Sequence, residues 1–317
     1  YHTKFYKLIG TNKQQQKETI TIEEGGVLRL SGIIVTHTKD ANGRGVTVNE
    51  GGKLDMTNGE ISGNNGHEVD GYDYCGGGVF VASEAVFNMM DNACITGNGA
   101  GTGGGVCVQG FFNMSGGKIV GNAASFGGGV RVDTGGTFNM TGNAEITNNI
   151  VGREGGGVYV GSYFNRPGSY FYMFDNAIIA NNKADSGGGG GIFVYNGQVE
   201  LSGGKIAGNT ASDGGGICNY GNVTMISGEI INNTASAGGG GVFNSNGPPK
   251  WTEVPAGSFV YSFFKMTGGE ITNNTADNGG GIFDCLDTFN KIGGEIINNK
   301  ATNIGNDICK PDDLSNG

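Results

Sequence analysis

A triple glycine followed by a β-branched residue recurs along this chain of 317 residues, which contains 66 glycines. Most successive copies are 24–28 residues apart, and insertions lengthen the other intervals. A repeat of this period is typical of a solenoid, in which each unit packs on its neighbours. The residue after the glycines is, copy by copy, Val79, Val106, Val130, Val158, Ile192, Ile217, Val242 and Ile282, and degenerate copies place Val46 and Ile308 at the two ends.

Each repeat contains three short segments in which apolar residues alternate with other residues, which is the period of a β-strand. The first reads Gly-Gly-Gly-Val-x-Val, the second Phe-x-Met and the third x-Ile-x-x-Asn, with Gly and Asn at the joints. We therefore predict an all-β, right-handed parallel β-helix with three short strands per ~25-residue coil and about ten coils. We place it over residues 43–309, after an N-terminal cap and first imperfect coil (1–42) and before a C-terminal tail (310–317).

An asparagine follows the interior isoleucine of each repeat by three residues. Stacked amides can bond along the axis and satisfy the backbone groups of a corner, so we interpret this row as structural and not as a row of ligands. We likewise expect the triple glycines to form a corner that needs positive φ or close packing, and not a nest for anions. The row consists of Asn64, Asn98, Asn122, Asn149, Asn182, Asn209, Asn233, Asn274 and Asn299.

The charge balance narrows the set of partners. The chain has 29 acidic and 19 basic residues, a formal net charge of −10. This negative charge argues against nucleic acid and anionic membrane surfaces as partners. No run of apolar residues approaches the ~18 of a membrane-spanning helix, so we expect no membrane insertion by this segment.

In one repeat the segment Ile271-Thr272-Asn273-Asn274-Thr275-Ala276 precedes Gly279-Gly280-Gly281-Ile282. This pattern resembles the adhesin-like bacterial surface repeats related to chlamydial polymorphic outer-membrane proteins, which pair Gly-Gly-(Ala/Gly)-(Ile/Val) with Phe-x-x-Asn. Here Ile usually replaces that phenylalanine, and Gly replaces the alanine. The resemblance implies a right-handed β-helix that is secreted or held at a cell surface, as an adhesin or an autotransporter passenger. It supplies no catalytic residues.

Many polysaccharide lyases and glycoside hydrolases are β-helices, so the fold alone does not exclude catalysis. A lyase needs acidic calcium ligands beside a base, and a hydrolase needs two carboxylates at a defined separation. We find no such group among the side chains predicted to point outward. Glu229, Glu270 and Glu295, one per coil, either attract a cation or splay into solvent. The predicted outward row of strand one is Thr47, Phe80, Cys107, Arg131, Tyr159, Phe193, Cys218, Phe243, Phe283 and Cys309.

These observations favour a non-enzymatic protein that needs no metal or other cofactor. We expect an adhesin or stalk that displays loops and binds a glycan or a surface protein of a host or neighbouring cell. A carbohydrate-active enzyme, either a polysaccharide lyase or a glycoside hydrolase, is the alternative.

The six cysteines scatter over the predicted coils. Cys107 and Cys218 share a row but lie four coils apart. Cys285 and Cys309 lie on adjacent coils with an offset of two residues, near the upper limit for a bridge. We therefore expect at most one disulfide, with Cys285–Cys309 as the candidate pair.

Two long insertions leave the same corner, between strand one and strand two. They are residues 161–170 and 245–263, and both are rich in aromatic residues. Loops on a rigid scaffold often carry function, and aromatic faces suit sugar rings or a peptide. The alternative is that these aromatics fold down and cover Phe193 and Phe243. The predicted ligand-binding residues are Tyr163, Phe164, Tyr170, Tyr195, Tyr220, Trp251 and Tyr261.

Overall fold

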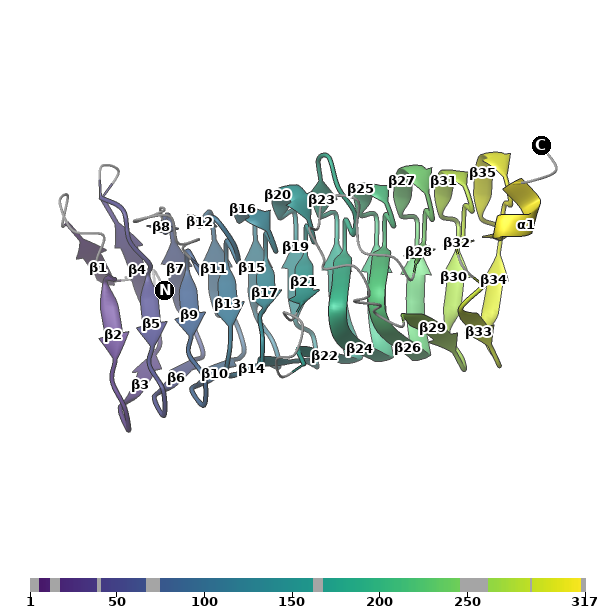
Figure 1. Cartoon of the computed structure of the whole chain (residues 1–317). Helices are drawn as coiled ribbons and strands as arrows, with labels where there is room; N and C mark the ends of the chain where they lie inside the picture. Colours follow the sequence, from purple (N-terminus) through teal and green to yellow (C-terminus); the bar gives the residue numbers. More distant parts are fainter. Residues whose placement is uncertain are drawn as a thin grey trace, which may run out of the picture.

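The computed structural model describes residues 6–11, 18–38, 41–66, 75–161, 168–245, 262–285 and 287–314. These residues form a parallel β-helix, and the predicted fold class is confirmed. Coils stack along one axis, from β2 at the N-terminal end to α1 at the other (Figure 1). Each strand pairs in parallel with its counterpart in the next coil, as β13 and β17 do through Val106 and Val130.

The three predicted strands of each coil belong to one large sheet. Strand one is β2 (Ile20–Ile22), β5 (Val46–Val48), β9 (Val79–Val81), β13 (Val106–Val108), β17 (Val130–Val132), β21 (Val158–Gly161), β28 (Val242–Asn244), β32 (Ile282–Asp284) and β36 (Ile308–Cys309). Strand two is β3 (Val27–Leu30), β6 (Lys53–Met56), β10 (Val86–Met89), β14 (Phe111–Met114), β18 (Thr137–Met140), β29 (Phe263–Met266) and β33 (Phe289–Lys291). Strand three is β4 (Ile33–His37), β7 (Gly59–Ser62), β11 (Cys94–Thr96), β15 (Lys118–Val120), β19 (Glu145–Thr147), β30 (Glu270–Thr272) and β34 (Glu295–Ile297).

In the central coils these strands run into one another. Strand β22 (Tyr170–Ala180) covers strands two and three, whereas β24 (Ile192–Ala207) and β26 (Ile217–Ile231) each cover all three. At the N-terminal end β1 (Tyr6–Gly10) pairs in parallel with β4. At the C-terminal end the four-residue helix α1 (Pro311–Leu314) follows the last coil.

A fourth short strand, which the sequence analysis missed, follows the asparagine corner. The residues there pair into a second parallel sheet along one long edge of the molecule (Figure 1). From the coil of β5 to the coil of β32, each coil therefore has a fourth strand in addition to the three predicted. The fourth strands are β8 (Asn65–Gly66), β12 (Gly99–Ala100), β16 (Ala123–Phe126), β20 (Ile150–Glu154), β23 (Lys183–Ala184), β25 (Thr210–Asp213), β27 (Thr234–Gly238), β31 (Thr275–Asn278) and β35 (Lys300–Ile304).

The interior is a set of ladders of identical or similar side chains. The Phe87 ring stacks on Phe112 with 4.7 Å between centroids, and Phe112 stacks on Phe138 at the same spacing. This spacing follows from the distance between parallel strands, so one well-packed coil sets the packing of the next. The valine, methionine and isoleucine rows are equally buried.

The predicted asparagine ladder is present, and it has a direction. Asn122 Nδ2 donates to Asn149 Oδ1 at 3.0 Å and to the carbonyl of Ile95 in the preceding coil at 3.0 Å. Asn122 Oδ1 accepts from both the backbone N–H and Nδ2 of Asn98, each at 3.0 Å. Every polar atom of the side chain is thereby satisfied without water, which favours the structural interpretation.

A chain of amides with one direction needs a donor at one end and an acceptor at the other. His37 Nδ1 lies 2.9 Å from Asn64 Oδ1, and since this oxygen can only accept, Nδ1 is the donor. At the other end Asp307 Oδ1 accepts from both the backbone N–H and Nδ2 of Asn299. The end residues thus fit the polarity of the ladder.

Corner geometry explains the residues on either side of the ladder. The residue before each ladder asparagine adopts a left-handed conformation, with φ of 64° at Gly208 and 57° at Asn232, for example. Gly and Asn are the residues that adopt this conformation at least cost. In the triple glycine, Gly214 has φ of 60°, and a Cβ on Gly216 would lie 2.6 Å from the carbonyl oxygen of Gly241. Both predicted reasons for the glycines, positive φ and close packing, therefore apply.

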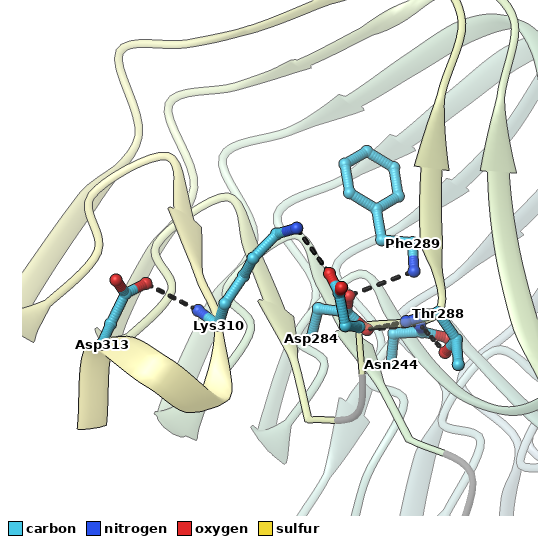
Figure 2. Close-up of polar contacts among 7 residues, drawn as sticks. Asn244, Asp284, Thr288, Phe289, Lys310 and Asp313 are labelled. Carbon is cyan, nitrogen blue, oxygen red and sulfur yellow. Dashed lines mark hydrogen bonds and ion pairs between the residues drawn. The ribbon is translucent and has the colours of Figure 1, made fainter. Parts of the chain in front are cut away.

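A second, shorter polar ladder replaces the inner valines of strand one near the C-terminal end. Asn219 Nδ2 donates to Asn244 Oδ1 at 2.8 Å, and Asn244 Nδ2 donates to Asp284 Oδ1 at 2.8 Å. Figure 2 shows the Asp284 carboxylate, which also accepts from the backbone N–H groups of Thr288 and Phe289. The two amides and the carboxylate are fully buried, so these bonds satisfy groups that water does not reach.

The predicted disulfide pairing is wrong. The bridge joins Cys75 to Cys107, with 5.5 Å between their Cα atoms, whereas Cys285 and Cys309 are free thiols. Cys75 directly precedes the glycines of its own coil, and its parallel bridge to Thr102 places it beside the next coil, where Cys107 lies on strand one. We compared cysteines only within the three predicted strands, so this contact between a joint and a strand was overlooked.

Candidate functional site

The row of strand one that we predicted to point into solvent is in fact covered. Phe193 and Cys218 are each 1% exposed, and Tyr159 is 6% exposed. The fourth strands and the residues that follow them fold over this row. The prediction failed because period-two alternation identifies the two faces of a strand but does not reveal that a further segment covers the outer one.

We call the covering residues, each of which directly precedes the glycines, the pre-glycine row. Bridges and strand pairing connect its members from coil to coil, for example Phe126 with Glu154, Gly188 with Asp213, and Asp213 with Gly238. Its members are Cys75, Thr102, Phe126, Glu154, Gly188, Asp213, Gly238, Asn278 and Ile304. The side chains of this row meet the outer side chains of strand one, and the disulfide is one such contact.

A cleft of about 430 Å³ lies beside Gly188, a member of the pre-glycine row that has no side chain. A Cβ on Gly188 would come within 2.6 Å of Cys218 Sγ, so the absence of a side chain there helps to keep the cleft open. Its lining comprises Glu154, Ser186, Gly187, Gly188, Phe193, Ser212, Asp213, Cys218, Tyr220, Ala237 and Phe243.

Aromatic rings form a stripe along the floor of the cleft. Phe193 stacks on Tyr159 with 5.2 Å between centroids. Strand one contributes only the small Cys218 in the next coil, and Tyr220 fills that space, with its centroid 5.8 Å from Phe193 and 6.0 Å from Phe243. The stripe therefore remains continuous across a coil that lacks an aromatic residue at the strand position.

Glu154 is the most unusual residue of the cleft. It is 2% exposed, and its Oε2 atom has no hydrogen-bond partner within the described part of the chain. Burial raises the pKa of this carboxyl to about 7, and the neighbouring Arg153 opposes the shift. The Arg153 guanidinium lies over the Phe126 ring, 5.5 Å from its centroid. A buried oxygen without a hydrogen-bond partner costs free energy. A ligand with a hydrogen-bond donor would supply the missing bond.

Asp213 provides a second carboxyl group on the opposite side of Gly188. It lies two steps from Glu154 along the pre-glycine row, about 10 Å at the spacing of parallel strands. Its Oδ1 accepts the backbone N–H of Gly238 at 3.1 Å. Between the two carboxyls, burial and both acidic side chains raise the pKa of Cys218, so this thiol stays neutral. Burial also raises the pKa of Tyr220, whose hydroxyl keeps its proton.

Of the predicted ligand-binding residues, three lie in the described part of the chain. Tyr195 and Tyr220 are paired in register on β24 and β26, and Tyr220 lines the cleft. Tyr195 packs at the edge of the cluster of Tyr159, Phe193 and Cys218. The other four, Tyr163, Phe164, Trp251 and Tyr261, lie outside the described residues.

Tyr170 belongs to a different face. It lies on β22, where its ring stacks with that of Tyr172 at 6.5 Å, and it is not among the residues that line the cleft. Tyr220 covers Phe193 and Phe243 in the way that our alternative interpretation assigned to the aromatic residues of the insertions.

The stack of acidic residues on strand three has the predicted register. Glu229 pairs with Glu270, and Glu270 pairs with Glu295. Lys205 Nζ lies 2.7 Å from Glu229 Oε2, so an ion pair closes one end of the stack. A shallow groove of about 560 Å³ runs past Lys205, Glu229 and Glu270. The charges are exposed and partly compensated, which is the pattern of a solvated face.

Sequence reasoning missed Glu154 and Asp213 because we examined only the rows inside the three predicted strands. A signal was available, since both directly precede a triple glycine and therefore share one position of the repeat. That position is occupied by residues of very different character, so it resembled a loop position and not a row with a common environment.

Comparison with known proteins yields no match to the chain among family models, curated proteins or solved structures. None of the helices in the described residues is both long and apolar enough to cross a membrane.

Proposed function

We propose that this protein is a non-enzymatic, exported β-helix of the cell surface, an adhesin or stalk, that binds a glycan in the cleft beside Phe193, Tyr220 and Phe243. The resemblance of the repeat to adhesin-like surface repeats supports the surface location. The net charge of −10 argues against nucleic acid as the partner.

The observation that carries the binding role is the combination, in one cleft, of aromatic rings and polar side chains, one of which has a buried oxygen without a partner in the described residues. Sugar rings present apolar faces that stack on aromatic side chains and hydroxyls that need hydrogen-bond partners. The cleft provides both, with Phe243 and Tyr220 on the floor and Ser186, Ser212 and Glu154 at the sides.

The scaffold is suited to hold such a site without rearrangement. Continuous ladders flank the cleft, with the asparagine ladder on one side of the coil and stacked interior side chains beneath strand one. A site that is formed before the ligand arrives loses less entropy on binding.

A glycan array with three forms of the protein tests the proposal. The wild type should bind a restricted set of oligosaccharides. Tyr220→Ala should lose at least about tenfold in affinity for them, because one stacking face is removed. Phe283→Ala is the matched control, since Phe283 stacks on Phe243 in the same row but does not line the cleft. Circular dichroism checks that both variants fold, and equal binding by Tyr220→Ala and the wild type would exclude this cleft.

Glycoside hydrolysis is a second candidate, favoured by the two carboxyls in one cleft. A neutral Glu154 has the protonation state of a general acid, and Asp213 could accept a proton from water. Their backbone positions are about 10 Å apart, slightly more than the ~6.5–9.5 Å that separates the two carboxyl groups of inverting hydrolases. Hydrolysis would be established if the protein releases reducing ends from the oligosaccharides that it binds on the array and Glu154→Gln does not. If the oligosaccharides are unchanged after prolonged incubation, the protein binds them without hydrolysing them.

A further inference from the structure

The charges around the cleft restrict its ligand more sharply than the aromatic rings do. Glu154 and Asp213 both line it, and no Lys, Arg or His is found among its described lining residues. Arg153, whose charge acts on Glu154, lies over the Phe126 ring and does not line the cleft. An anionic ligand would thus meet two acidic groups and no basic group inside the cleft.

Rings beside acidic groups form a familiar environment for organic cations. An ammonium group is attracted to the face of a Tyr or Phe ring, and a carboxylate adds a charge-assisted hydrogen bond. Here Tyr220 and Phe243 provide the rings, and Glu154 Oε2 provides a buried acceptor without a partner in the described residues. The hydroxyl of a neutral sugar would satisfy that oxygen less well than a charged donor would.

We propose that the glycan bound in this cleft carries an organic ammonium group, as an oligosaccharide of unacetylated amino sugars does, and that Glu154 receives that group. The inference rests on the proposed function and specifies the ligand class of the same cleft. The amine would lie between Glu154 and the Tyr220 ring, with the sugar ring against Phe243. Asp213 would hold a second amine or a hydroxyl of the neighbouring sugar unit.

The protonation of Glu154 provides an independent signature. With the cleft empty, burial favours the neutral carboxyl, and the groups that face it are Arg153, Asp213, the Cys218 thiol and the Tyr220 hydroxyl. A bound cation stabilises the ionised form, so binding should expel a proton. A permanently charged probe such as tetramethylammonium isolates this effect, because its own charge does not change with pH.

The experiment compares three tetrasaccharides of the same linkage by calorimetry: glucosamine, N-acetylglucosamine and glucose. The wild type should bind the amino form at least about tenfold more tightly than the other two. Glu154→Gln should abolish most of this preference, because the amide carries no charge that attracts the ammonium group. Glu229→Gln removes the same charge on another face and should retain the preference, which separates a specific site from general attraction to an acidic protein.

Proton release is measured with tetramethylammonium in two buffers of different ionisation enthalpy. At pH 7 the wild type should release about half a proton per bound probe, and Glu154→Gln should release none.

Equal binding of all three tetrasaccharides would overturn the ammonium assignment but leave glycan binding intact. Binding of tetramethylammonium without binding of any tetrasaccharide would support the ammonium site and exclude the glycan. Equal loss of the preference in Glu154→Gln and Glu229→Gln would also overturn the proposal.

Discussion

Replacing Asn233 with leucine tests whether the asparagine ladder holds the coils together. Asn233 makes four side-chain hydrogen bonds: Nδ2 donates to Ile206 O at 2.9 Å and to Asn274 Oδ1 at 3.0 Å, and Oδ1 accepts from the backbone and side chain of Asn209, both at 2.9 Å. Leucine leaves three buried groups without partners, namely the Asn209 N–H, one Asn209 amide hydrogen and the Ile206 carbonyl. At about 1–3 kcal/mol each, offset in part by the apolar leucine, the loss should be about 3–6 kcal/mol.

Asn113→Leu is the matched control. Asn113 belongs to an outward ladder on β14, where it bonds to Asn88 and Asn139 at 2.9 Å and is only half-buried. Water can replace these bonds, so the loss should stay within about 1 kcal/mol. Urea unfolding measures both variants, and hydrogen exchange of the Asn209 amide reports the local effect, which matters because coils can open separately. Equal midpoints for the two variants, with unchanged exchange at Asn209, would refute the reasoning.

Three further predictions concern corners, the bridge and the buried acid. Asn232 has φ of 57°, so Asn232→Ala should cost about 1 kcal/mol in urea unfolding, whereas Asn232→Gly should be close to neutral. Cys75→Ser opens a bridge between residues 32 apart and should cost about 3–4 kcal/mol in oxidising buffer; no difference from the wild type there would contradict it. Burial raises the pKa of Glu154 from 4.5 to about 7, so folding is favoured below pH 4.5 and loses up to about 3 kcal/mol as pH rises through 7. Glu154→Gln cannot ionise, and it should match the wild type at pH 4 but unfold at higher urea at pH 8; equal midpoints at pH 8 would count against a buried neutral acid.

The interior of this fold is readable from sequence because stacking makes each coil a copy of the last. Phe112 and Phe138 occupy the same repeat position, and the structure stacks them at 4.7 Å. The asparagine ladder follows in the same way from the spacing between the interior isoleucine and the corner. Local periodicity was sufficient for these features, since their partners are the equivalent residues of adjacent coils.

The site was harder to predict because its contacts join different positions of the repeat. Glu154 and Phe193 line the same cleft only because the fourth strand folds back over strand one, and no local sequence pattern specifies that arrangement. Cys75 was overlooked as the disulfide partner of Cys107 for the same reason, because it too lies outside the three predicted strands. Tyr220 was predicted as a ligand-binding residue from its place after strand one, and the structure places it in the cleft, but through packing between Phe193 and Phe243.

A bulky side chain placed in the cleft tests most directly whether the cleft binds the glycan. Ala237 is an exposed lining residue two positions before Gly239, and Ser125 holds the same position before Gly127, outside the cleft. Ala237→Trp and Ser125→Trp therefore add the same bulk at equivalent exposed sites. On a glycan array, Ala237→Trp should lose at least about tenfold in affinity for the oligosaccharides that the wild type binds, whereas Ser125→Trp should bind as the wild type does. Undiminished binding by folded Ala237→Trp would contradict the assignment of the ligand to this cleft.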